Sequence, residues 1–461
     1  MTDSLLRLLP DLIDEARRTA ESAIAAAREE SATGDARDSC DSRDSRGSAD
    51  GTGVPDPAAP AALLDPADPA GLVITDDNLR ALARLAVAAP GSAALVYLDP
   101  PFDSRADYRS RILTRTAAGE RLVVEHLAYR DRWADGTAEY LRMLVPRLVV
   151  ALRLLRPDGA LCVHLDWHAS HLVRLVLDEL LGRDAFVNHL VWSYRSGGAS
   201  RTASVPRKHD DLLLYRAGPG FRIRGLRERQ YLDKPFMGSR RDAEGRHYVD
   251  TILRDVLEGV RTLVDDDGAT ETVSVRPVLN VSAERTGYAT QKPEGLLEIL
   301  LRWTTDPGDL VVDAFGGSGT TAVVAHRLGR RFTTIDASPR AAAVARARLD
   351  AAGAPARLLA PAPRRDPAAV DARRTDGGAA VELVGFAPDP GFPTRLGGDA
   401  DAAARDGLAA VAGWSVGGAA AWRTPAGELA TRLPLTPPTA AGVEIEVVDL
   451  AGERTAAPLR D

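Results

Sequence analysis

The sequence predicts an α/β fold, and two features of the pattern support that prediction. A continuous apolar run of strand length at residues 93–98 indicates a strand buried on both faces, as in a parallel sheet covered by helices. Short apolar strands also alternate with helical patterns over residues 138–181 and again over 294–351. That alternation is typical of sheets whose strands are joined by helical crossovers.

Composition excludes several classes of protein. The 461 residues include only two cysteines, which excludes a disulfide framework and a four-cysteine zinc site and fits a reducing, cytoplasmic location. No apolar run reaches the roughly 18 residues of a membrane-spanning helix, so no membrane partner is expected. The first 15 residues contain early acidic residues and no small-residue cleavage site, unlike a secretory signal.

Charge is distributed unevenly along the chain. The net charge is −7, but residues 1–70 hold 15 acidic residues against 7 arginines. Residues 195–254 hold 14 basic and 7 acidic residues. The acidic N-terminal segment therefore offsets a basic middle region in the overall net charge. A local basic excess of this kind favours nucleic-acid binding more than the overall charge suggests. A solvated arginine-rich face is the alternative for residues 195–246.

The first 70 residues divide into two parts. Apolar positions at helical spacing predict an amphipathic helix within residues 1–30, which serves either as a dimerisation or docking element or as an appendage. Residues 31–70 are rich in Ser, Asp, Gly, Pro and Ala and lack large apolar groups, so we expect a disordered linker. Ordered structure is expected to begin near Gly71.

The remaining elements follow in order. The pattern predicts helices at 76–87, with Asp76 or Asp77 as the cap, and at 138–155, 168–181, 294–302, 318–329 and 338–351. It predicts strands at 93–98, 160–165, 309–314 and 331–336. Residues 205–290 are polar and irregular in pattern. Beyond residue 354 the composition shifts to Ala, Pro, Gly and Arg, with strand-like runs at 381–384 and 443–447, which predicts a small, loosely specified C-terminal module.

A glycine-rich turn follows the strand at 309–314. Glycines at 316, 317 and 319 allow a sharp turn and a close approach of backbone to a ligand. Asp336 lies 20 residues after Gly316, the spacing at which an acid reaches a ribose hydroxyl in nucleotide-binding folds. Together with Asp313 it would repel a diphosphate but suit a cationic ligand with a ribose, such as S-adenosyl-L-methionine. A turn without a ligand and a dinucleotide site are the alternatives.

A second motif, Asp99-Pro100-Pro101-Phe102, stands at the carboxyl end of the strand at 93–98. The prolines remove two N–H donors and leave the Asp99 carboxylate and the Pro100 carbonyl as acceptors, which suits an NH2 group. Accepting both hydrogens favours a pyramidal nitrogen whose lone pair can attack, and Phe102 offers a face for a base that has left the duplex. A rigid turn at a strand end is the alternative.

Taken together, the motifs resemble those of the amino-group DNA methyltransferases, in the branch where the catalytic tetrad precedes the cofactor loop. The similarity spans about residues 71–350 and includes segments at 76–79, 97–102, 161–168, 208–210, 284–293 and 315–321. It is greatest to the modification subunits of type III restriction systems and their stand-alone relatives. The resemblance implies a Rossmann-like, S-adenosylmethionine-dependent methyltransferase fold with an inserted target-recognition region.

The resemblance also implies roles for individual residues. The tetrad Asp99, Pro100, Pro101 and Phe102 would hold the target amine, and Asp336 would bind the cofactor ribose. Cofactor contacts would come from Phe315, Gly316, Gly317, Ser318, Gly319 and Thr320, with Asp313 at the mouth of the turn. Thr290, Gln291 and Lys292 would lie beside the methionine moiety. Lys292 is one of only three lysines, against 55 arginines, which fits a position that arginine fills poorly.

On this interpretation the chain divides into a catalytic half at 71–204, a target-recognition region at 205–288, a cofactor-binding half at 289–352 and an accessory module at 353–461. The expected reaction is methyl transfer to the 6-amino group of adenine in double-stranded DNA, in a restriction-modification or related defence system. A homodimer and a restriction subunit are further candidate partners. The 4-amino group of cytosine is the nearest alternative, followed by RNA or small-molecule methylation and by non-catalytic DNA binding.

A metal site is the remaining hypothesis. His164, Asp166, His168 and His171 are of ligand type, and His168 and His171 lie one helical turn apart. Packing of a strand and a helix explains the same segment, and methyl transfer needs no metal. No metal is therefore expected.

Overall fold

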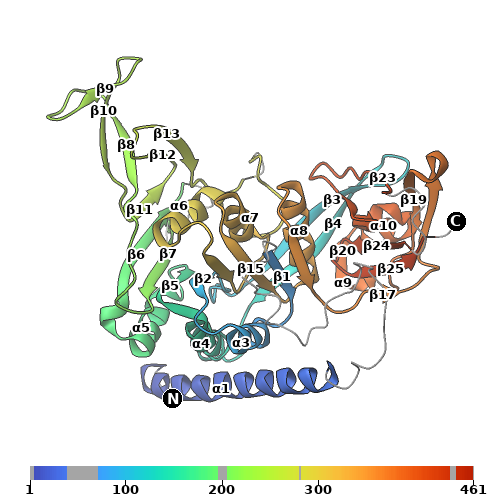
Figure 1. The fold of residues 1–461 in the computed structure, drawn as a ribbon, viewed down its shortest axis with the longest axis horizontal. Coiled ribbons are helices and arrows are strands. Elements are labelled where there is room, and N and C mark those ends of the chain that lie inside the picture. The colour runs from blue at the N-terminus through green and yellow to red at the C-terminus, as the bar shows by residue number, and fades with distance from the viewer. Residues whose placement is uncertain (1–4, 39–70, 196–204, 280–281, 437–442, 460–461) are drawn as a thin grey trace.

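A nine-stranded sheet forms the centre of the molecule in the computed structural model (Figure 1). The structure describes residues 5–38, 71–195, 205–279, 282–436 and 443–459. Within this part of the chain the strands lie in the order β11-β6-β7-β5-β2-β14-β15-β1-β16. Helices α3, α4 and α5 cover one face, and α6, α7 and α8 cover the other. This three-layer arrangement is the predicted Rossmann-like α/β fold.

The elements of the core have the following bounds. The strands are β1 (Gly71–Thr75), β2 (Ala93–Leu98), β5 (Leu155–Leu165), β6 (Phe186–Ser193), β7 (His209–Arg216), β11 (Val256–Glu258), β14 (Leu310–Asp313), β15 (Arg331–Asp336) and β16 (Ala356–Leu359). The helices are α3 (Asn78–Ala88), α4 (Thr137–Leu154), α5 (Ser170–Leu181), α6 (Glu294–Thr304), α7 (Thr320–Arg327) and α8 (Pro339–Ala351).

The sheet is parallel except at β7. Strand β7 is antiparallel to both of its neighbours, β5 and β6, whereas the other adjacent pairs are parallel. Because β7 is a buried core strand, the predicted boundary of the target-recognition region at residue 205 is wrong. The apolar part of this strand is short and follows three polar residues, His209, Asp210 and Asp211, so the sequence pattern did not predict a buried strand there.

Helix α1 (Leu5–Asp38) packs against α3 and α4 as part of the main hydrophobic core (Figure 1). Leu12, Ala16 and Ala20 are almost fully buried there. The helix continues eight residues beyond the predicted end at residue 30, so the predicted linker begins too early. Residues 39–70 of that linker lie outside the described residues.

Two β structures extend from the core. A long hairpin of β3 (Ala106–Arg115) and β4 (Arg121–Asp131) follows the tetrad. On the opposite side, an arm projects from the molecule (Figure 1). The arm is a five-stranded sheet of β8 (Arg227–Leu232), β9 (Arg240–Arg241), β10 (His247–Ile252), β12 (Val260–Val264) and β13 (Thr270–Ser274). Neither structure follows from the apolar pattern, because their strands alternate polar and half-buried residues.

The C-terminal module is more definite than predicted. Its strands are β17 (Arg364–Arg365), β18 (Val370–Thr375), β19 (Ala380–Phe386), β20 (Leu396–Gly398), β21 (Val411–Val416), β22 (Ala419–Trp422), β23 (Arg432–Pro434), β24 (Glu444–Asp449) and β25 (Arg454–Pro458), with short helices α9 (Phe392–Arg395) and α10 (Ala400–Asp406). Its own hydrophobic core surrounds Trp414, which is 1% exposed. The description of this region as loosely specified was therefore wrong.

None of the helices in the described ranges combines the length and the apolar character that crossing a bilayer requires.

Candidate active site

A tight glycine turn joins β14 to α7. A Cβ atom on Gly316 would lie 2.0 Å from the hydroxyl oxygen of Thr334 on β15, so a side chain there would collide with the sheet. Gly319 has a φ of +75°, in the left-handed region, and its Cβ would lie 2.7 Å from that of Ala345 on α8. The backbone of Gly316 and Gly317 consequently forms one wall of a cavity.

Two carboxylates lie beside this turn. The Asp336 carboxylate accepts hydrogen bonds from the backbone N–H of Gly317 (2.9 Å) and Ser338 (2.8 Å). Asp313 is 3% exposed and accepts one from the backbone N–H of Phe315 (3.0 Å). Burial raises the pKa of Asp313 to about 7 and also raises the pKa of Asp336. A cation bound here would stabilise both carboxylates.

The tetrad begins at the same edge of the sheet. Strands β2 and β14 are parallel neighbours, with Tyr97 opposite Asp313. The backbone N–H of Ala314 donates to the carbonyl of Tyr97 (3.1 Å), which extends the pairing past the end of β14. Asp99, two residues after Tyr97, therefore lies next to the glycine turn, as parallel strands with aligned carboxyl ends require.

Asp99 forms an ion pair with Lys292. The Lys292 ammonium donates to both oxygens of the Asp99 carboxylate, at 2.7 and 2.6 Å. The same nitrogen lies 5.1 Å from the centroid of the Phe102 ring, and the Lys292 carbonyl accepts a hydrogen bond from the Thr320 hydroxyl (3.1 Å). Lys292 thus contacts the tetrad through its side chain and the start of α7 through its carbonyl oxygen.

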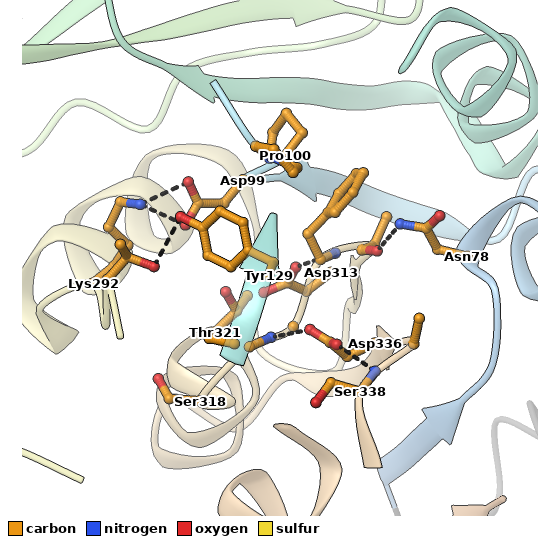
Figure 2. Close-up of a pocket in the computed structure, with 18 of the residues that line it drawn as sticks. Asn78, Asp99, Pro100, Tyr129, Lys292, Asp313, Ser318, Thr321, Asp336 and Ser338 are labelled. Carbon is orange, nitrogen blue, oxygen red and sulfur yellow. Dashed lines mark hydrogen bonds and ion pairs between the residues drawn. The ribbon is translucent and has the colours of Figure 1, made fainter. Parts of the chain in front are cut away.

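A cavity of about 300 Å³ brings these groups together (Figure 2). Of the residues predicted from the sequence, its lining includes Asp99, Pro100, Pro101, Thr290, Gln291, Lys292, Asp313, Phe315, Gly316, Gly317, Ser318, Thr320 and Asp336. Phe102 and Gly319 do not line it. The Phe102 ring stacks on His164 with centroids 6.0 Å apart, and Gly319 faces α8. The Gln291 side-chain oxygen is occupied by the backbone N–H (2.9 Å) and hydroxyl (2.8 Å) of Thr286.

Several lining residues were not among the predicted site residues. The Asn78 amide nitrogen donates to the carbonyl of Ala314 (2.8 Å), and Tyr129 enters the cavity from β4 (Figure 2). Tyr288 and Trp133 also line it. Asn78 directly follows a helix cap at Asp77, and this could have marked it, but no local signal indicates that Tyr129 reaches the site, because the hairpin was not predicted.

The histidine segment is organised by hydrogen bonds. His164 is fully buried; its Nδ1 lies 2.8 Å from the Tyr97 hydroxyl and its Nε2 lies 3.2 Å from a carboxylate oxygen of Asp210. His168 instead contacts Asp166, with Nδ1 to oxygen at 2.7 Å. In the described ranges, no three His, Cys, Asp or Glu side chains are grouped as metal ligands would be.

Comparison with known proteins identifies the family. A protein-family model described as DNA methylase matches residues 93–347, more than half of the chain. The chain belongs to this DNA methylase family. Its core has the α/β fold that was predicted from the sequence.

Individual relatives agree with this assignment. The type II methyltransferase M2.DpnII of Streptococcus pneumoniae is 40% identical over 282 residues, which cover 61% of this chain and 90% of the relative. The type II methyltransferase M.EcaI of Enterobacter cloacae is 27% identical over 58% of this chain, which spans 66% of that relative, slightly less than two thirds. The EcoP15I Mod subunit of Escherichia coli, from a type III restriction-modification enzyme, is 25% identical over 31% of this chain and 24% of its own length.

Solved structures also match. The crystal structure of the M1.HpyAVI-SAM complex covers 60% of this chain and 98% of its own, with 16% identity and a TM-score of 0.38. The PvuII DNA methyltransferase, described as cytosine-N4-specific, covers 62% of this chain and 94% of its own, with 17% identity and a TM-score of 0.39.

The residues around the cavity fit S-adenosylmethionine. Two buried carboxylates, Asp313 and Asp336, would balance its positive charges, and burial raises the pKa of both groups, so a bound cation would favour their ionised forms. The oxygens of Asp336 each accept one backbone hydrogen bond and keep further lone pairs for ribose hydroxyls. At Gly317 a Cβ would lie 3.4 Å from the ring of Tyr288, which also lines the cavity, so the missing Cβ allows a ligand to approach the backbone closely there.

Proposed function

We propose that this methylase transfers the methyl group of S-adenosylmethionine to the 6-amino group of adenine in double-stranded DNA. One observation supports this most directly: the Asp99 carboxylate and the glycine turn at Gly316 line the same cavity. A tetrad that holds an amine and a turn that holds a cofactor are useful for a single transfer only if both face one space. The shared cavity meets that requirement.

The chemistry follows from the acceptors at the end of β2. Asp99 and the Pro100 carbonyl accept the two amine hydrogens, which draws the nitrogen lone pair out of conjugation with the ring. S-adenosylmethionine, when bound, supplies an electrophilic methyl group and a neutral thioether leaving group. After the nitrogen–carbon bond forms, the nitrogen carries one proton too many, and Asp99 is placed to accept it. In the structure Lys292 donates to both Asp99 oxygens, so the amine must displace at least one of these contacts.

The target base must leave the duplex to reach Asp99. Aromatic rings lie at or near the site: Tyr129 lines the cavity and stacks on Tyr108 with centroids 4.7 Å apart, and Phe102, outside the lining, stacks on His164. We assign these rings to the flipped base, because aromatic faces stabilise an unstacked base by stacking.

The arm, which runs from Arg227 to Ser274 and excludes the core strand β11, is the proposed target-recognition structure. It exposes Phe236 and Met237 at one tip, at 70% and 89%, together with basic residues such as Arg241. Basic side chains there would contact phosphates, and some would read base edges. The names of the relatives support a restriction-modification setting, in which a restriction subunit or a second copy of this chain would be a partner.

The nearest competing activity is methylation of the 4-amino group of cytosine. The same acceptors would hold either amine, and we favour adenine because position 99 is Asp rather than Ser. Digesting DNA methylated by the purified chain to nucleosides and identifying the product by mass spectrometry separates the two. N4-methyl-2′-deoxycytidine without N6-methyl-2′-deoxyadenosine would refute the adenine assignment.

Replacing the central carboxylate tests the mechanism. Asp99→Ala removes the acceptor for the amine hydrogens and for the released proton, so methyl transfer should fall by about 10²–10⁴-fold. Cofactor affinity, measured by calorimetry, should stay within about threefold, because the glycine turn is unchanged. Glu179→Gln, an exposed substitution on α5, is the control and should retain full activity. Methylation by Asp99→Ala at the normal rate would refute the proposed role.

A further inference from the structure

The turn that follows the tetrad has a strained backbone. Asp103 and Arg105 have φ angles of 59° and 60°, in the left-handed region that residues other than glycine rarely adopt. Such conformations persist only where surrounding contacts impose them, and they are concentrated at functional sites. Some other part of the molecule must therefore hold this turn in place.

A single buried carboxylate holds it. The Oδ2 atom of Asp131 accepts hydrogen bonds from the backbone N–H groups of Phe102 (3.0 Å) and Ser104 (2.8 Å) and from the Ser104 hydroxyl (2.6 Å). Its Oδ1 atom accepts from the backbone N–H of Asp103 (2.9 Å) and from Trp133 Nε1 (3.1 Å). Asp131 is 1% exposed. Three consecutive backbone donors, beginning at the last tetrad residue, thus converge on one side chain.

The hairpin that carries Asp131 also holds the opposite side of the site. On β3, the Ser110 hydroxyl oxygen accepts a hydrogen bond from the backbone N–H of Ala289 (2.9 Å). On β4, the Tyr129 hydroxyl donates to the hydroxyl oxygen of Thr290 (3.4 Å). The backbone of Thr290 has a φ of 55°, in the left-handed region. The hairpin therefore contacts a strained residue on each side of the Asp99–Lys292 ion pair.

The other end of the hairpin is fixed by the C-terminal module (Figure 1). Strand β20 pairs with β4 in antiparallel register, with Gly398 opposite Val124. The Asp399 carboxylate accepts from the backbone N–H of Val123 (2.8 Å), and the Asp399 N–H donates to the Val123 carbonyl (3.0 Å). Val124 is fully buried in the hydrophobic core around Trp414.

These two ends belong to one continuous strand. Residues 124 and 131 on β4 are seven residues apart, about 23 Å along an extended chain. We propose that the β3–β4 hairpin is a positioning element for the catalytic tetrad, with Asp131 as its positioning residue and the C-terminal module as its anchor. This inference rests on the proposed function, and it assigns the C-terminal module a part in completing the active site.

The test compares three variants with one control. Asp131→Asn removes the charge that organises the turn, Ser104→Ala removes one donor to it, and Asp399→Ala weakens the anchor. Glu382→Gln changes the same module at an exposed ion pair with Arg373, away from the hairpin, and is the control. The measurements are the single-turnover methylation rate, the affinities for cofactor and DNA, and hydrogen exchange of the full-length protein.

We expect the methylation rate to fall at least tenfold in Asp131→Asn, less in Ser104→Ala, and severalfold in Asp399→Ala, with both affinities within about threefold of the unmodified chain. Hydrogen exchange should accelerate in peptides covering residues 100–105 and remain unchanged in the strands of the core sheet. The control should match the unmodified chain in every measurement. If Asp131→Asn does not fold, the other two variants decide the matter by the same criteria.

Two results would overturn the proposal. One is an unchanged rate and unchanged exchange at residues 100–105 in the variants. The other is a loss of cofactor affinity together with faster exchange throughout the core sheet, because that pattern indicates general stabilisation rather than positioning. If the unmodified chain fails to methylate DNA, the proposed function fails, whereas the exchange comparison still decides whether Asp131 holds the turn.

Discussion

At the scale of single residues, the site depends on charges placed where water is largely excluded. The Lys292 ammonium compensates Asp99, and both side chains are mostly buried. Within the described ranges Asp313 forms no such ion pair, and desolvation by burial raises its pKa to about 7. The carboxylate of Asp313 beside the glycine turn therefore favours a cationic ligand in this part of the cavity.

A pH dependence of cofactor binding follows from Asp313. Because a bound cation favours the ionised carboxylate, S-adenosylmethionine affinity should be nearly constant above pH 7 and should weaken by up to tenfold per pH unit below it. Asp313→Asn should weaken binding and remove this dependence. Calorimetry between pH 6 and 8 measures both effects, and proton release on binding should appear in buffers of different ionisation enthalpy. Affinity independent of pH in the unmodified chain would contradict the prediction.

The same raised pKa affects the stability of the protein without cofactor. The folded state holds a proton on Asp313 more tightly than the unfolded chain, whose aspartates have a pKa of about 3.9. Stability from this group is therefore present at low pH and is lost as the pH rises from about 4 toward 7.

At the scale of elements, the glycine turn shows how strand and helix geometry select particular residues. Strand β15 lies directly under the turn, and α8 packs against it, so positions 316 and 319 have no room for a side chain. The contacts that exclude a side chain come from residues distant in sequence, Thr334 and Ala345. The turn is therefore shaped by packing as well as by the flexibility of glycine.

Adding one methyl group at this turn should be costly. Gly316→Ala would place a Cβ against the Thr334 hydroxyl, so we expect a loss of about 1–3 kcal/mol in the free energy of unfolding and weaker cofactor binding. Gly225→Ala is the matched control, since a Cβ there meets no atom within 4 Å, and its effect should stay below about 1 kcal/mol. Urea unfolding measures both variants. Equal free energies of unfolding for the two variants would show that β15 shifts to accommodate the added methyl group.

At the scale of the whole molecule, the active site lies in a core that carries an arm on one side and the C-terminal module on the other (Figure 1). The net charge of −7 gives no indication of this arrangement, because the acidic excess is in the first 70 residues. Binding to a polyanion therefore depends on where basic side chains lie on the folded surface.

The proposed role of the arm predicts a specific salt dependence. Arg241 is exposed at one end of the arm, so Arg241→Ala should weaken DNA binding similarly for all sequences and reduce the slope of log affinity against log salt by about one. Arg373→Ala, which disrupts an exposed ion pair on the C-terminal module, should leave the slope unchanged. Titrations of fluorescent DNA at several salt concentrations measure both. An unchanged slope in Arg241→Ala would place the phosphate contacts elsewhere.

Several elements of the core lie close to their predicted bounds. Strand β2 has the predicted bounds, 93–98, and α6, α8, β14 and β15 lie within two residues of theirs. Asp77 caps α3 by accepting from the backbone N–H groups of Leu79 and Arg80, as the pattern at 76–87 indicated. These elements were predictable because buried strands and helices bounded by caps or glycines leave strong local patterns.

The sequence by itself determined the α/β class, the tetrad, the glycine turn and the family, because each depends on residues adjacent in the chain. Only the tertiary structure decided that β7 runs against its neighbours and that α1 belongs to the core. The tertiary structure alone places the Asp131 carboxylate against the backbone of residues 102–104 and pairs β20 of the C-terminal module with β4 of the hairpin. The physical reason is that these contacts join residues with large sequence separation, and half-buried alternating strands and single polar side chains do not specify their distant partners.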